Sequence, residues 1–234
     1  MSYTIRNVPF ISQLEKYPTG CESVSAVMAL QYILADQSLS VEEFIDSYLP
    51  KGPAPRMAYP HQRDAAEKPT LIGPDPWEVF PGDPYSTHGW GCFAPALKQA
   101  IEKCLKKKGI DLEPVELYQL PIDYLCHEYI DRDIPVIFWA TIGMAKAHER
   151  LVWKADTGRE IHWMSPMHCT LLIGYETEPA DDTGSRMASV ISHYVFNDPT
   201  SGERAVFPAK AVEEAYRAQG TQALVIIPPE GVKK

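Results

Sequence analysis

The spacing of apolar positions changes about halfway along the chain. Before residue 134, apolar residues recur every three or four positions, as on one face of a helix. After it, β-branched and aromatic runs bounded by Pro, Gly, Asn and Asp are typical of strands. An α+β fold is therefore expected, with a helical N-terminal half packed on a mainly antiparallel β-sheet from the C-terminal half. The expected helices are 19–34, 41–49, 95–108, 120–133 and 208–220, and the expected strands are 5–11, 113–118, 134–142, 168–176, 189–198 and 222–228.

Two helix starts carry a Ser/Thr-x-x-Glu pattern. Thr19 with Glu22, and Ser40 with Glu43, match the capping box, in which each side chain accepts a backbone N–H at the start of the helix. Thr19 is therefore the expected N-cap of the first helix, which places Cys21 in its first turn.

Residues 50–89 differ from the rest of the chain. Nine prolines and four glycines fall in this stretch, so a long loop with little regular structure is expected near a cleft. No repeat or composition shift marks a boundary, and residues 1–234 are predicted to form a single domain.

The net charge and the apolar runs limit the expected partners, and the N-terminus and the cysteines limit the expected compartment. The formal net charge of −9 argues against nucleic-acid binding, and no apolar run approaches the length of a membrane segment. The N-terminus shows no secretory signal, and the five cysteines are too sparse for a disulfide framework. A cytoplasmic protein is expected, or a secreted one if a signal was omitted from this chain. No obligate protein partner is evident.

The position of Cys21 suggests a nucleophile. Unpaired N–H groups and the positive dipole end of a helix stabilise a thiolate, so we expect a lowered thiol pKa. His168 follows 147 residues later at the start of a predicted strand, and Asp198 ends the next predicted strand. Adjacent antiparallel strands would bring these two together as base and orienting carboxylate, whereas alternation turns Asn197 to the opposite face.

Further residues are candidates for binding. The side chain of Gln13 is a donor that, with the Cys21 N–H, would bind an oxyanion. Gly20 makes the turn, lets a substrate approach closely, or does both. Trp90 is a candidate for lining the cleft, and Trp163 for either substrate contact or packing. A zinc site formed by His162, His168, Cys169 and Cys21 is disfavoured, because neighbouring strand residues point to opposite faces.

Five segments resemble the C39-like cysteine peptidase family, stand-alone bacterial relatives of bacteriocin-processing peptidases. They are "VPFISQLEKYPTGCESVSAVMALQYI", "DPWEVFPGDPY", "GWGCFAPAL", "MHCTLLIGYE" and "FNDPTSG". The resemblance implies a papain-like fold and a triad of Cys21, His168 and Asp198, with Gln13 in the oxyanion hole.

The predicted function is hydrolysis of peptide bonds in a peptide or protein substrate. No metal or cofactor is expected. Two alternatives stay open: a catalytically silent module that binds peptides in the same cleft, and an amidase or acyltransferase that uses the same thiol acyl-enzyme chemistry.

Overall fold

The computed structural model describes residues 2–58, 70–179 and 189–228. In these residues a seven-stranded sheet has the order β12-β11-β10-β7-β13-β6, and β1 pairs with β10. Each of these pairings is antiparallel. The strands are β1 (Tyr3–Thr4), β6 (Glu113–Tyr118), β7 (Val136–Thr141), β10 (Met167–Pro179), β11 (Ser189–Asp198), β12 (Gly202–Pro208) and β13 (Gln222–Ile227). The expected mixed fold with a large antiparallel sheet is confirmed.

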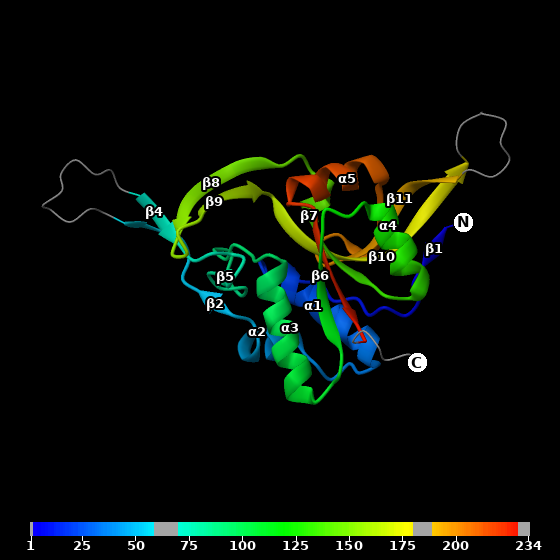
Figure 1. The fold of residues 1–234 in the computed structure, drawn as a ribbon, viewed down its shortest axis with the longest axis horizontal. Helices are drawn as coiled ribbons and strands as arrows, with labels where there is room; N and C mark the ends of the chain where they lie inside the picture. Colours follow the sequence, from blue (N-terminus) through cyan, green and yellow to red (C-terminus); the bar gives the residue numbers. More distant parts are fainter. Residues whose placement is uncertain (1, 59–69, 180–188, 229–234) are drawn as a thin grey trace, which may run out of the picture.

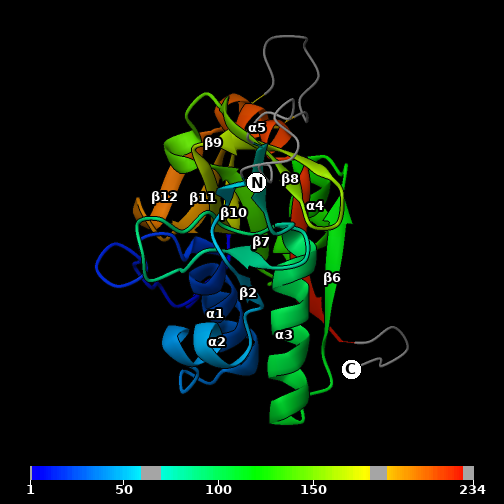
Figure 2. The ribbon, with the colours of Figure 1, turned by 90° about the vertical axis from the view of Figure 1, so that its left-hand side faces the viewer.

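Helices cover the sheet from two sides. In both ribbon views, helices α1 (Cys21–Leu34), α2 (Val41–Ser47) and α3 (Ala94–Lys108) lie below β10 and β11 and beside β6, and α5 (Ala209–Ala218) lies above them (Figures 1 and 2). Helix α1 contacts β7, β10 and β13, whereas α5 contacts β7, β11 and β12. Because both faces of β7 are covered, all six of its residues are buried, which explains its continuous apolar sequence.

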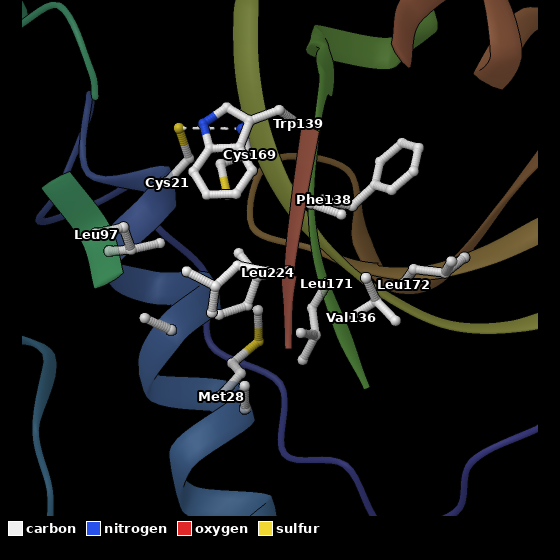
Figure 3. Close-up of a cluster of buried hydrophobic side chains, with 14 of the residues drawn as sticks. Cys21, Met28, Leu97, Val136, Phe138, Trp139, Cys169, Leu171, Leu172 and Leu224 are labelled. Carbon is white, nitrogen blue, oxygen red and sulfur yellow. Dashed lines mark hydrogen bonds between the residues drawn. The ribbon is translucent and has the colours of Figure 1, made fainter. Parts of the chain in front are cut away.

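The main core lies between α1 and the sheet. Figure 3 shows Met28 of α1 facing Leu224 of β13 and Leu171 of β10, with Leu97 of α3 beside them. The first ten residues of α1 are all buried. Burial on every side of this helix fixes the position of its first residue, Cys21.

A second, smaller sheet lies beside the main one. It has the order β3-β4-β8-β9, formed by β3 (Arg56–Ala58), β4 (Thr70–Gly73), β8 (His148–Ala155) and β9 (Glu160–Ser165). A short parallel pair, β2 (Lys51–Gly52) and β5 (Phe80–Pro81), lies nearby in sequence. The segment expected to be a long loop thus contains four short strands; its residues 59–69 lie outside the described part.

Most predicted elements are confirmed, two need correction, and some strands were not predicted. Helix α3 has Pro at its start and Gly109 as its C-cap, as predicted. The predicted helix over 120–133 is divided into α4 (Ile122–Glu128) and a 3₁₀ turn. The predicted strand over 5–11 is absent, and the β8–β9 hairpin and β12 were not predicted.

Candidate active site

The start of α1 is held in a different way from the one predicted. Its N-cap is Gly20, and no side chain caps it. The hydroxyl of Thr19 instead donates to the carbonyl oxygens of Asp83 (3.2 Å) and Ser86 (2.9 Å). The Glu22 carboxylate accepts the Cys92 N–H at 2.7 Å. The predicted Thr19–Glu22 capping box is therefore wrong, because both side chains bind the 83–92 loop. The second box is half present, since Ser40 accepts the Glu43 N–H.

Gly20 lies in a tight turn before Cys21. A Cβ at this position would lie 2.9 Å from the Cβ of Tyr17, closer than side chains pack. The Gly20 backbone is not in the left-handed region, since its φ is −98°. Packing against Tyr17 is thus sufficient to require glycine, and close approach of a substrate remains a prediction.

His168 and Asp198 meet where their strands lie side by side. His168 is the second residue of β10, Asp198 is the last residue of β11, and the two strands are antiparallel neighbours. The His168 Nε2 lies 2.8 Å from the Asp198 Oδ1, and both side chains are buried. The contact predicted from the two strand ends is confirmed.

Asp198 is held in its ionised form by donors from the following turn. Its Oδ1 accepts the N–H and the hydroxyl of Thr200, each at 2.8 Å, and the N–H of Ser201 at 3.2 Å. Burial alone would raise the pKa of Asp198. The hydrogen bond from His168, the charge of that ring and the two Thr200 donors together hold the pKa far below its ordinary value. The side chain of Asn197 points away and donates to the carbonyl oxygens of Val8 and Pro9, as alternation predicts.

The sulfur of Cys21 faces β10. It accepts the N–H of Cys169, the residue after His168, at 3.4 Å (Figure 3). Its thiol donates to the Glu22 Oε2, also at 3.4 Å. Among the described residues, no hydrogen bond joins Cys21 directly to His168. The sulfur is therefore placed beside the backbone that carries the imidazole.

The expected lowering of the Cys21 pKa is not found. Only 6% of Cys21 is exposed. Burial, followed by the negative charge of Glu22, raises the pKa of Cys21 well above its ordinary value, and the Cys169 N–H opposes this only in part. Burial and the adjacent Glu22 carboxylate outweigh the effect of the helix end, from which the lower pKa was predicted.

Gln13 links the two halves of the site. Its backbone N–H donates to the Pro199 carbonyl oxygen and its side-chain Nε2 donates to the Pro18 carbonyl oxygen, both at 3.1 Å. Gln13 is buried, and its Oε1 is without a hydrogen-bond partner in the described chain. The residue is thus tied both to the turn before Cys21 and to the turn after Asp198.

The two predicted binding tryptophans belong to one aromatic cluster. Trp163 is 3% exposed and packs in the core of the smaller sheet with Trp153. Trp90 is half-buried, with its ring 5.8 Å from that of Trp163 and the Arg150 guanidinium 5.3 Å above it. Packing is the role that the contacts of Trp163 support, while Trp90 keeps some exposed surface.

Glu22 was missed as a site residue. It is completely buried, and burial raises its pKa to about 7 even though the Cys92 N–H and the Cys21 thiol act in the opposite direction. The signal in the sequence was a charged residue inside an otherwise apolar helix, directly after the candidate nucleophile. It was interpreted as a cap because local capping patterns are common at helix starts.

Cys92, Cys104 and Cys126 are buried, as their positions predicted. In the described ranges, no group of three or more His, Cys, Asp or Glu side chains is arranged to hold a metal ion. None of the helices in that part of the chain is long and apolar enough to span a membrane.

Comparisons with known proteins bear on the family and the fold of this chain. One crystal structure with the provisional description of a C39-like peptidase, from Bacillus anthracis, superposes with a TM-score of 0.71 at 23% identity, covering 100% of this chain and 98% of that one. A comparison with curated proteins finds no match. The model of the Peptidase_C39 like family matches residues 5–224. The chain therefore belongs to the Peptidase_C39 like family.

Proposed function

We propose that this chain is a cysteine peptidase with a papain-like fold, built as a single domain, that hydrolyses peptide bonds. The observation that carries the proposal is the buried 2.8 Å contact of His168 with Asp198, beside the backbone N–H that reaches the Cys21 sulfur. A histidine oriented by a buried carboxylate next to a thiol is the arrangement that nucleophilic catalysis requires.

Each member of the proposed triad has a distinct task. Asp198 bonds to the Nε2 of His168, which leaves Nδ1 as the ring nitrogen that exchanges a proton with Cys21. The thiolate attacks the carbonyl carbon of the peptide, and the imidazolium then protonates the leaving amine. Water activated by His168 hydrolyses the thioester and restores the thiol.

Gln13 is the proposed oxyanion donor, together with the Cys21 N–H. Its Nε2 carries two protons, of which one is used by the Pro18 carbonyl, so the second is available to a negatively charged oxygen. Because Gln13 is held at both its backbone and its side chain, it is ordered before substrate binds, as effective oxyanion stabilisation requires. Replacing Gln13 by Ala is expected to lower kcat by about 10²- to 10³-fold.

The segment that precedes α3 is proposed to form one side of the substrate cleft. It is bonded to the turn before Cys21 through Thr19 and carries the half-exposed Trp90. Gly20 and Trp90 are the residues proposed to contact the substrate, and Trp163, also predicted to bind it, is proposed to act by supporting Trp90 from behind.

The test is incubation of the chain with a peptide library, followed by mass spectrometry of the products. The Cys21→Ala variant should lose all cleavage, while Cys104→Ala, which changes a buried cysteine on α3, should retain it. Peptides captured intact by both the wild type and Cys21→Ala would show a silent binding module instead. Products that carry an added amine in place of water would show acyl transfer.

A further inference from the structure

Glu22 is the one buried carboxylate in contact with the Cys21 thiol among the described residues. Its Oε2 lies 3.4 Å from the sulfur and its Oε1 accepts the Cys92 N–H at 2.7 Å, so both oxygens are used. The side chain is fully buried. Its position is therefore fixed on one side by the nucleophile and on the other by the loop before α3.

The backbone of that loop closes over the carboxylate. A Cβ on Gly91 would lie 2.6 Å from the Glu22 Oε1 and 2.1 Å from the Met167 Cε, so only glycine allows this approach. Gly91 also has a φ of +125°, which glycine adopts without strain. Water is thereby kept from the carboxylate, which increases the cost of a negative charge there.

The groups that face Glu22 offer little to balance that charge. They are the thiols of Cys21 on α1, Cys92 in the loop and Cys169 on β10. His168 of β10 is already paired with Asp198 of β11. Within the described residues Glu22 makes no ion pair with a lysine or arginine.

Two negative charges 3.4 Å apart in a buried site are strongly disfavoured, so a thiolate and an ionised Glu22 compete. We infer that Glu22 is a positioning residue whose protonation controls Cys21: the thiolate forms when Glu22 is neutral. In that state Glu22 is protonated on Oε2 and donates a hydrogen bond to the sulfur, while its Oε1 still accepts the Cys92 N–H. The proton that leaves the sulfur goes to His168. When Glu22 is ionised, the proton remains on the sulfur and the nucleophile is inactive.

The inference builds on the proposed role of Cys21, but it can be tested without any substrate. The measurement is the rate of iodoacetamide alkylation of Cys21 against pH, followed on the Cys21 peptide by mass spectrometry, with Cys21→Ala to confirm the assignment. Glu22→Gln keeps the oxygen that accepts the Cys92 N–H and removes the charge. Its profile should have one step, at lower pH than the last wild-type step, so that alkylation at pH 8, where Glu22 is ionised in the wild type, is about tenfold faster, while the rates at pH 6 differ little.

Two further measurements separate a positioning role from a structural one. The wild-type profile should show two steps, one of them near pH 7, where Glu22 loses its proton. This expectation holds even if the variant does not fold. Glu102→Gln, the same change on the exposed side of α3, should reproduce the wild-type profile.

The outcomes are distinct. A single-step wild-type profile, or a Glu22→Gln profile that coincides with the wild type, would overturn the inference. A shifted profile in a chain that cleaves no peptide would support the inference and count against the proposed peptidase. No alkylation of Cys21 at any pH would refute both.

Discussion

Replacing Glu22 by Gln should change how the free energy of unfolding depends on pH. Burial raises the pKa of Glu22 to about 7, against an ordinary value of 4.5. Between these values the folded chain holds a proton that the unfolded chain has released. The stability that the neutral carboxyl contributes is therefore fully present below pH 4.5 and is lost as the pH rises through 7.

The size of this effect follows from the difference in pKa. The folded and unfolded pKa values differ by about 2.5, and one pKa unit is worth about 1.36 kcal/mol. At pH values well above 7, the free energy of unfolding is therefore lower by about 3 kcal/mol. The Glu22 side chain is buried, so no reduction for solvent screening applies. The free energy of unfolding of Glu22→Gln, minus that of the wild type, should accordingly increase by about 3 kcal/mol between pH 4 and pH 8.

The assay is urea unfolding under reducing conditions, followed by tryptophan fluorescence at four or five pH values. Glu102→Gln, at a carboxylate that is half exposed on α3, measures how much the same substitution changes the curve at the surface. If the Glu22→Gln and wild-type curves run parallel across this range, Glu22 ionises equally easily in the folded and unfolded chains, and the reasoning from its burial fails.

Three other substitutions test the site. Asp198→Asn should lower kcat by about 10³- to 10⁴-fold, and unchanged activity on a peptide substrate would contradict its role. The variant should also lose less stability at acid pH than the wild type, because a carboxylate with a lowered pKa stabilises the fold only above its unfolded pKa. Gly91→Ala should destabilise by about 2 kcal/mol more than Gly202→Ala in urea, because both have φ near +125° but only Gly91 is crowded; equal losses would contradict the packing argument. Thr19→Val should increase proteolytic cutting near Ser86 while leaving a distant loop unaffected, because two hydrogen bonds are lost; an unchanged cutting pattern would speak against the tether.

The sequence allowed the large sheet and the His168–Asp198 contact to be predicted because both depend on local periodicity. Successive strands such as β10 and β11 often pair, so His168 and Asp198 meet at the adjoining ends, whereas the position of β13 between β7 and β6 joins distant segments. The small sheet was missed because two of its strands, β3 and β4, come from a segment rich in proline. Parallel pairing of β4 with β8 joins residues about eighty positions apart, which no local pattern reveals.

The incorrect predictions near the site have the same origin. The segment 5–11 does not continue as a strand because Pro9 lacks an N–H, and the Asn197 side chain takes up the carbonyl oxygens of Val8 and Pro9. The Glu22 side chain was predicted to cap its own helix, but it accepts the N–H of Cys92, 70 positions away. In both cases a distant group satisfies a polar atom that local reasoning had paired nearby.

The uncapped start of α1 has a consequence for the proposed chemistry. An N-cap side chain contributes about 1 kcal/mol to a helix, and α1 does without it while Thr19 binds the 83–86 turn. A cap would have used an N–H of the first turn as its donor. Without the cap, no capping side chain takes up the N–H groups of the first turn, and Thr19 and Glu22 bind the 83–92 loop instead. The stability given up at the helix end is thus consistent with a position selected for its chemistry.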